Sequence, residues 1–344
     1  MHRGARGRTV ARWAVFAAVA LLGAIILSPL WSPGNARGGA ERRTIVAHGA
    51  VALEEVFVRG IFPAFEEEWG RRTGEEVHFV GSFSPLGIVT EALLKGAPAH
   101  IALLSAASGA HDLEVAGVAP SESSFALPHG GVMSRTPIII AVRPGNPLAI
   151  SGFEDLARPG VKVIQPDPLV SGTGQWVIFA EYGSTLRRTG DSHAATEVLV
   201  GIARNVAARA SSPLEACRLF AEGLGDVLVT SEHEVLGVAG LPGLEIIYPR
   251  STILGEPTLV VIERNVDPAE RGLIEAFLGF VWSEAGQGIF ARQGFRSIDG
   301  QLRDSAPRPI EDPFLIGDLG GWKSARREIV EGIWRNRVLK EVRR

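Results

Sequence analysis

The stretch Val163-Ile-Gln-Pro-Asp-Pro-Leu-Val-Ser-Gly-Thr-Gly-Gln-Trp176 decides how the fold of this chain is interpreted. It begins with a short apolar run that stops at Pro166 and Pro168, and proline is largely excluded from the interior of a sheet. From Trp176 onward the apolar residues recur at helical spacing, and the small residues 171–174 lie between the two parts. The sequence therefore predicts a strand, a turn and a helix.

The start of this predicted helix suits an anion. Its first N–H groups have no acceptor within the helix, the positive end of the helix dipole points outward there, and the glycines let a ligand approach the main chain. Ser171, Gly172 and Thr173 are the candidate contacts. The alternative is an ordinary capped helix, because serine and glycine open many helices that bind nothing.

The composition is that of a globular protein. A length of 344 residues is enough for two domains, and 46% hydrophobic with 21% charged residues argues against disorder. The single Cys217 cannot form an internal disulfide and is expected to be a small buried apolar residue. No cysteine spacing typical of a metal site occurs, and we expect no cofactor.

The first forty residues differ from the rest. Four arginines precede an apolar run over residues 14–30, and small, turn-forming residues follow, as in a secretory signal. An uncleaved N-terminal anchor is the alternative, because the run is long for a signal and short for a membrane span. Either way, we expect the remainder to be exported. Removing residues 1–40, which contain five arginines and no acid, changes the formal net charge from −3 to −8. Nucleic acid is therefore not an expected partner, and an anion would need local donors.

Strands and helices alternate along the rest of the chain. The expected strands are 44–47, 76–80, 97–104, 132–142, 161–164, 226–230 and 258–262, and the expected helices are 51–69, 88–95, 152–156, 176–182, 194–206, 269–290 and 329–338. This alternation predicts a mostly parallel sheet, whose ligand crevice lies beyond the carboxyl ends of the strands.

Serines mark two further helix starts. Ser82 and Ser84 follow a predicted strand, and Ser84 with the proline after it is expected to form the N-cap and first helical position. Ser212, its following proline and Glu215 match the pattern of a capping box. We expect these starts to lie at the same sheet edge as the start near Ser171.

Five motifs resemble the periplasmic sulfate/thiosulfate-binding proteins of ABC importers, which are type II periplasmic binding proteins. They are GSFSPLGIVTEALLKGAPAHIALLS (81–105), RPGVKVIQPDPLVSGTGQW (158–176), GLGDVLVTSEHEVL (223–236), STILGEPTLVV (251–261) and DLGGW (318–322). The resemblance extends from about residue 45 to residue 322. The order of the motifs is more specific than any one of them.

The resemblance implies a two-lobed α/β fold of the Venus-flytrap kind, in which each lobe is a mixed, mostly parallel sheet flanked by helices. It implies that the chain crosses between the lobes near residues 134–138 and 255–259. The expected domains are residues 1–40 as a signal peptide or N-terminal anchor, residues 41–135 plus 258–344 as lobe 1, and residues 136–257 as lobe 2.

The resemblance also implies that serine hydroxyls and helix-start N–H groups hold a dehydrated tetrahedral dianion between the lobes. The matching positions are Ser82 and Ser84 from lobe 1, and Ser171, Gly172, Thr173, Ser211 and Ser212 from lobe 2. Ser231 stands where sulfate binders have tryptophan, and we include it as a ligand candidate. Arg135 is a candidate positive charge for the ligand, or else part of a hinge ion pair.

Several alternatives stay open. A sulfate-like ion needs donors only, whereas a protonated phosphate also needs an acceptor, and Asp167 could be that acceptor or a turn residue. Molybdate, tungstate or an organic anion would also suit a donor site. A metal-binding protein could use the scattered His48, His129 and His233. An exported hydrolase could use Ser171 or Ser84, but neither lies in a Gly-x-Ser-x-Gly motif.

We therefore expect an exported, monomeric receptor without enzymatic activity that delivers a small inorganic anion, sulfate or thiosulfate, to the permease and ATPase subunits of an ABC importer. Burying a dianion without a countercharge is costly unless every oxygen is hydrogen-bonded. Ligand binding and closure of the lobes are then expected to be one event.

Overall fold

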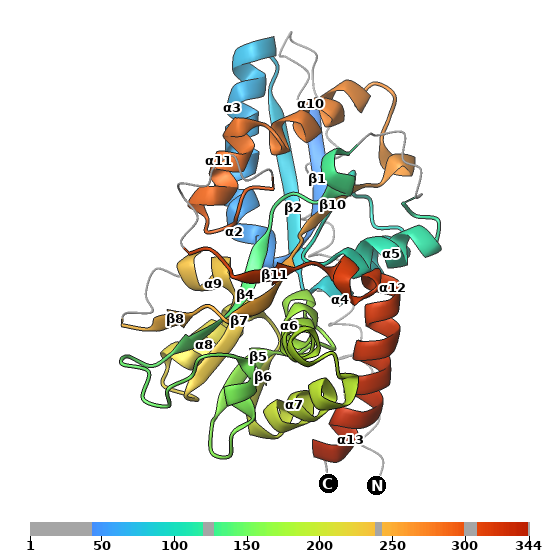
Figure 1. Ribbon diagram of the computed structural model, residues 1–344. Helices are drawn as coiled ribbons and strands as arrows, with labels where there is room; N and C mark the ends of the chain where they lie inside the picture. The colour runs from blue at the N-terminus through green and yellow to red at the C-terminus, as the bar shows by residue number, and fades with distance from the viewer. Residues whose placement is uncertain (1–42, 120–126, 238–242, 299–307, 343–344) are drawn as a thin grey trace, which may run out of the picture. The chain divides into compact units, whose positions relative to one another are not determined.

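The computed structural model describes residues 43–119, 127–237, 243–298 and 308–342. Their strands form two sheets flanked by helices, which confirms the prediction of a two-lobed α/β fold (Figure 1). The predicted leader, residues 1–40, lies outside the described residues. Within the described segments, no helix is both long enough and apolar enough to cross a membrane.

The first lobe contains a four-stranded sheet in the order β10-β3-β1-β2. β1 (Arg43–Ala50) is parallel to β2 (Val77–Ser84) and to β3 (Ile101–Leu104), and β10 (Thr258–Val261) is antiparallel to β3. Because three of these strands are parallel, their carboxyl ends lie at one edge of the sheet.

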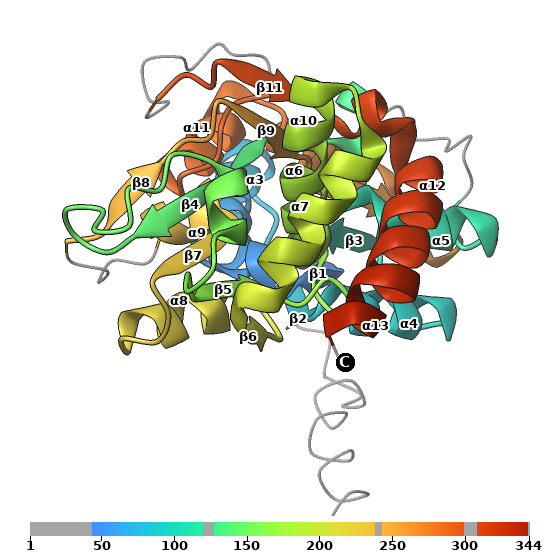
Figure 2. The same ribbon diagram turned by 60° about the horizontal axis from the view of Figure 1, so that its bottom comes forward.

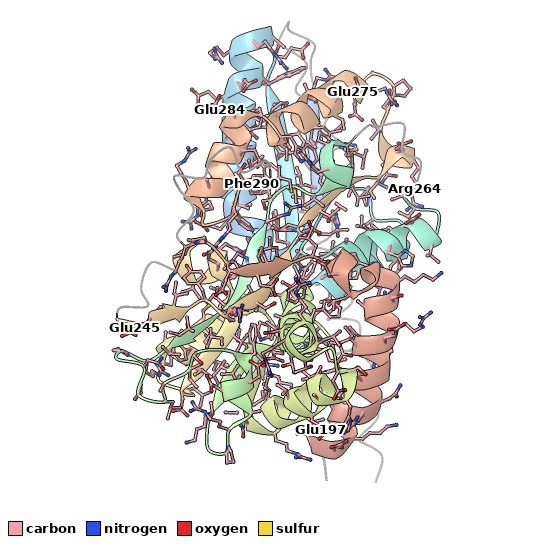
Figure 3. All side chains as sticks on the ribbon, in the orientation of Figure 1. Glu197, Glu245, Arg264, Glu275, Glu284 and Phe290 are labelled. Carbon is pink, nitrogen blue, oxygen red and sulfur yellow. The ribbon has the colours of Figure 1, made fainter. Side chains whose placement is uncertain are left out.

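Helices cover this sheet and enclose an aromatic core. Phe62, Phe65, Phe277 and Phe290 are buried there, whereas Glu284, at the start of the helix that carries Phe290, is exposed (Figure 3). The helical segments are η2 (Val51–Leu53), α2 (Glu54–Val56), η3 (Phe57–Ile61), α3 (Phe62–Thr73), α4 (Leu86–Leu94), α5 (Ala107–Val115), η4 (Pro128–Gly131), η6 (Glu263–Asn265), α10 (Arg271–Val281) and α11 (Glu284–Arg292).

Two predicted helices differ in detail from the structure. The helical segments from Val51 to Thr73 follow one another without a gap, with a π-helical turn just before Pro63, which accommodates a residue that has no N–H to donate. The single helix predicted over residues 269–290 is wrong. Ser283 interrupts it and caps a second helix, because its hydroxyl accepts from the Gly286 N–H at 3.2 Å.

The second lobe contains a seven-stranded sheet in the order β11-β9-β4-β7-β5-β6, with β8 also paired to β4. β5 lies between β6 and β7 and is parallel to both, whereas β4 is antiparallel to β7, β8 and β9. The strands are β4 (Thr136–Val142), β5 (Val163–Pro166), β6 (Val206–Ala210), β7 (Val227–Ser231), β8 (Glu245–Ile247), β9 (Ser251–Gly255) and β11 (Asp312–Phe314).

The helices of the second lobe include the long α6, whose residues 172–185 are buried except for Gln175. Cys217 on α8 is buried as predicted, and burial raises the pKa of its thiol to about 12. Figure 2 shows α6 and α7 beside the C-terminal helical segments, which pack against both. The helical segments are η5 (Phe153–Ala157), α6 (Gly172–Thr189), α7 (Ser192–Asn205), α8 (Pro213–Ala221), α9 (Glu232–Gly237), η8 (Ile316–Leu319), α12 (Gly321–Ala325), η9 (Arg326–Val338) and α13 (Leu339–Val342).

In the part of the chain that the structure describes, successive segments lie in different lobes at three places. Val132 bridges to β10 of the first sheet and Thr136 opens β4 of the second, and β9 ends at Gly255 just before β10 begins. A third passage follows Phe295, which packs in the first-lobe core, and leads to β11, which pairs with β9.

The C-terminal segment differs from the predicted lobe 1 of residues 41–135 plus 258–344. From Asp312 onward it joins the second lobe, because Phe314, Trp334 and Val338 are buried in the same apolar cluster as α6 and α7. It also contacts the first lobe, because α12 packs against α5 and Arg326 pairs with Asp112.

Candidate functional site

A small cavity lies where five strand ends from the two lobes meet. Its lining residues follow β1, β2 and β3 in the first lobe and β5 and β6 in the second. They are Ala50, Val51, Ala52, Pro85, Leu86, Ser105, Ser171, Gly172, Thr173, Ser211, Ser212 and Pro213. This oxyanion cavity, as we call it for the chemistry described below, measures about 10 Å³, so the lobes nearly touch across it. Its position is the crevice that alternating strands and helices predict.

The start of α6 forms half of the second lobe's side, and the start of α8 forms the other half. Ser171 is the N-cap, and its hydroxyl accepts from the Gly174 N–H at 3.3 Å. Gly172 and Thr173 are the first two helical residues, so their N–H groups have no acceptor within the helix. All three residues are buried, and all three line the cavity. The predicted strand, turn and helix are confirmed.

Glycine is required at two positions of this turn. A Cβ atom on Gly172 would lie 2.4 Å from the Ser105 hydroxyl and 2.9 Å from a methyl group of Leu86, both in the first lobe. A Cβ atom on Gly174 would lie 2.6 Å from the carbonyl carbon of Asp167. The first glycine therefore permits the lobes to close, and the second permits the turn to form.

Ser105 and the residues after β1 line the cavity, but the sequence prediction does not include them. Ser105 directly follows β3, and its carbonyl accepts from the indole N–H of Trp176 on α6 at 2.9 Å. This hydrogen bond joins the two lobes beside the cavity. Ser105 could have been predicted from its sequence context, because a buried strand ends there in a serine followed by small residues, which is the same pattern that marks Ser171. Residues 50–52 open a helix directly after β1, but without a hydroxyl they gave no such signal.

Ser82 and Ser84 lie on the last residues of β2 and not in a turn. Ser84 pairs with Ala50 at the sheet edge next to the cavity, whereas Ser82 is exposed beside His48. The prediction that Ser84 caps the next helix is wrong. Pro85 occupies the N-cap position with extended backbone, because β2 continues in register with β1 up to Ser84.

Ser211 and Ser212 line the cavity from the start of α8. The Ser212 hydroxyl accepts from the Glu215 N–H at 3.2 Å, which confirms it as the N-cap. The Glu215 carboxylate reaches one residue further back than predicted and accepts from both the N–H and the hydroxyl of Ser211, at 2.7 and 2.6 Å. Those two hydrogen bonds lower the pKa of Glu215. The donors of Ser211 are therefore already used within the lobe.

Ser231 and Arg135 do not line the oxyanion cavity. Ser231 ends β7 and is buried, with no hydrogen-bond partner for its hydroxyl. Arg135 lies where the chain passes between lobes and donates to Glu256 at 3.2 Å, which matches the hinge ion pair that we gave as its alternative role.

The electrostatic character of the oxyanion cavity comes from dipoles. None of the described residues that line it has an ionisable side chain. Asp167, the candidate acceptor, accepts from the Leu169 N–H through its carboxylate at 2.9 Å and from the Ser171 N–H through its carbonyl at 2.9 Å. It is a turn residue, so the cavity presents mainly donors.

The described residues offer little support for metal binding or for hydrolysis. Within the described ranges, no group of three or more His, Cys, Asp or Glu residues is placed to hold a metal ion. His48 is half-buried on β1, and burial lowers its pKa. No histidine or acid lines the described part of the cavity beside Ser171, so a hydrolytic triad has no base there.

Two α/β lobes, joined by crossing strands and meeting at a cavity bordered by helix starts, define a class of receptor that closes on a small ligand. Residues 49–296 match the family of bacterial extracellular solute-binding proteins. The chain belongs to this family.

Relatives of known name extend over most of the chain. A sulfate-binding protein of Synechococcus elongatus is 28% identical, with 90% of each chain covered. A thiosulfate-binding protein of Pseudomonas aeruginosa is 29% identical, with 87% of this chain and 93% of that one covered. The solved structure of the sulfate-binding protein SubI from Mycobacterium tuberculosis has a TM-score of 0.74 at 26% identity, with 83% of this chain and 99% of that chain covered.

Proposed function

We propose that this protein is the extracytoplasmic receptor of an ABC importer and binds a tetrahedral oxyanion, sulfate or thiosulfate, in the oxyanion cavity. The observation that supports this most is the meeting of helix starts and serines from five strand ends, without an ionisable side chain among the described lining residues. A fully deprotonated oxyanion accepts hydrogen bonds and donates none, so such a lining suits it.

The donors come in two kinds. Backbone N–H groups at the starts of α6 and of the helix after β1 belong to residues that line the cavity, where the positive ends of the helix dipoles lie. Hydroxyl groups of Ser171, Ser105 and Ser212 add donors whose hydrogens can rotate toward the ligand. Ser84 stands at the same edge, whereas Ser82, Ser231 and Arg135 are not part of the proposed contact set.

Closure of the lobes completes the site. The cavity is too small to exchange its contents without separation of the lobes, and the strands that pass between them near residues 132–136 and 255–258 are the proposed hinge. The Trp176 hydrogen bond to Ser105 is then made in the closed form and broken in the open one. The closed form is the one that we expect a permease to recognise.

The relatives support this assignment, since the names of the two similar curated proteins and of the solved structure specify sulfate or thiosulfate. On the same grounds we propose a transport role without catalysis, export by the N-terminal segment, and permease and ATPase subunits as partners.

Isothermal titration of the purified protein with sulfate, thiosulfate, molybdate, tungstate and phosphate tests the proposal. We expect sulfate or thiosulfate to bind at micromolar or lower concentration and phosphate to bind more weakly, because no acceptor stands ready for its proton. Tight binding of a divalent metal together with no response to any of the anions would contradict it.

A further inference from the structure

A second and larger cavity lies next to the oxyanion cavity. It measures about 470 Å³, within the range of ordinary small-molecule sites. It shares Val51, Ala52 and Pro213 with the oxyanion cavity, so the two lie side by side. We call it the side cavity. Its walls come from α2 and η3 of the first lobe and from α8 and α9 of the second, and Figure 1 shows α2 and α9 next to each other.

The residues that line the side cavity include more acidic than basic side chains. Glu54, Glu55 and Glu234 line it, together with Arg59, which pairs with Glu55 at 3.4 Å. Among the described lining residues, His233 is the other titratable group. Before His233 is counted, the three carboxylates and one guanidinium give this lining a net charge of −2, which is the opposite of what a second anion site would need.

Glu234 is a buried residue with one carboxylate oxygen that has no hydrogen-bond partner. The residue is 9% exposed, and its Oε1 atom makes no hydrogen bond. The nearest charged candidate is Nε2 of His233 at 3.3 Å, but neither atom has hydrogen-bond geometry to the other. His233 is held in place by Phe295, whose ring stacks on it at 3.9 Å, and by the Thr136 hydroxyl, 3.2 Å from Nδ1. A carboxylate left in this way is costly, and a cation in the cavity would satisfy it.

Apolar side chains fill the rest of the wall. Val58 on η3 and Leu214 on α8 are 45% and 56% exposed, and both border the cavity, as does the ring of Phe295. These surfaces suit a short hydrocarbon segment between the donors of the oxyanion cavity and the carboxylate of Glu234.

From this arrangement, and resting on the proposed function, we propose that the protein also takes a larger ligand: an aliphatic sulfonate or sulfate ester that bears a protonated amine. The oxyanion group occupies the oxyanion cavity, the hydrocarbon segment lies between Val58 and Leu214, and the ammonium group donates to Glu234. The side cavity thus selects among oxyanions by what is attached to them.

Titration with two matched pairs tests this: ethanesulfonate with aminoethanesulfonate, and propanesulfonate with aminopropanesulfonate, with inorganic sulfate measured alongside. We expect the amine-bearing member of at least one pair to bind about tenfold more tightly than its partner, since hydrogen bonds to charged groups are the stronger ones. Glu234→Gln should abolish that difference and leave sulfate affinity within about twofold, whereas the matched change Glu67→Gln on the exposed face of α3 should preserve both.

Leu214→Lys provides a second variant in case Glu234→Gln does not fold, because Leu214 is exposed. A lysine there replaces part of the apolar wall and places a cation at the cavity, so within each pair it should abolish the advantage of the amine-bearing member. If sulfate binds but the amine adds no affinity in either pair, the inference fails and the proposed function stands. If no oxyanion binds at all, both fail.

Discussion

The oxyanion cavity and the side cavity share three lining residues but are built from different chemistry. The first is bordered by helix starts and serine hydroxyls, the second by carboxylates, His233 and apolar side chains. Backbone N–H groups are held by the fold and remain neutral in the absence of a ligand, so they can be buried together at the lobe boundary. Ionised side chains need a partner to be buried in this way, as Glu232 has in Arg296 at 2.7 Å, and those of the side cavity border a larger space. The comparison suggests that the fold determines whether an oxyanion binds and that side chains at the margin determine which one.

The largest expected effect comes from placing a charge in the oxyanion cavity. Gly172→Asp would put a carboxylate against Ser105 and against the bound anion. Two unit charges about 4 Å apart repel by ~4 kcal/mol at an effective dielectric constant of 20, which corresponds to roughly a thousandfold loss of sulfate affinity. Titration calorimetry measures it. Gly279→Asp, at a glycine whose Cβ would meet nothing, is the control and should leave affinity unchanged. Retained affinity in Gly172→Asp would place the anion elsewhere.

Ser171→Ala should have the next largest effect on ligand affinity. It removes a hydroxyl donor and the N-cap of α6, so we expect about a tenfold loss of sulfate affinity and a stability loss of ~1 kcal/mol. Ser283→Ala removes an equivalent cap, 3.2 Å from Gly286 N, in the first lobe away from the cavity. It should lower the melting temperature and spare the affinity. Equal affinities for the two variants would mean that Ser171 acts only as a cap.

A smaller effect is expected at the lobe boundary. Trp176→Phe removes the hydrogen bond to the Ser105 carbonyl, worth ~1 kcal/mol, and should weaken sulfate binding about fivefold by destabilising the closed form. Thr252→Val removes a buried bond inside the second-lobe sheet, 2.7 Å to the Ile138 carbonyl, and should not affect binding. Small-angle scattering at saturating sulfate would show whether Trp176→Phe closes less completely. If both variants bind alike, the Trp176 bond does not depend on closure.

A buried carboxylate that lines neither cavity sharpens the comparison with Glu234. Glu181 on α6 is fully buried, and burial raises its pKa well above the ordinary value of 4.5 despite the opposing charge of Arg209. Between the unfolded and folded pKa values the folded protein binds more protons, so its stability falls as the pH rises above about 4.5. Glu181→Gln should reduce that fall and raise the melting temperature at pH 8 relative to the wild type, without changing ligand preference. Thermal unfolding between pH 5 and 9 tests it. A variant less stable at pH 8 would show that Glu181 is ionised and paired.

Much of the second lobe's side of the oxyanion cavity follows from local sequence. Ser171 and the residues after it are recognisable because a strand ended by prolines, a run of small residues and a helical pattern all lie within one short stretch. Ser212 is recognisable for a similar reason, because its proline and Glu215 have fixed places in a helix start. In both cases the interactions that hold the donors span only a few residues.

The first lobe's side was harder to predict. Ser84 lies one residue too early to cap α4, since pairing with β1 extends the strand, and strand length depends on a partner distant in sequence. Ser105 and Trp176 are 71 residues apart, so no local pattern connects them. The same holds for Arg135, whose partner Glu256 is contributed by the second crossing strand.

The sequence by itself determined the alternation of strands and helices and the helix starts that provide donors, because backbone conformation and capping depend on residues close in the chain. The two-lobed class came from the resemblance of its motifs to a known family. Only the tertiary structure decided which starts meet, that Ser211 is already bound by Glu215, and that an acidic cavity adjoins the neutral one. Those features depend on how distant segments pack across the lobe boundary, and packing is set by the whole chain at once.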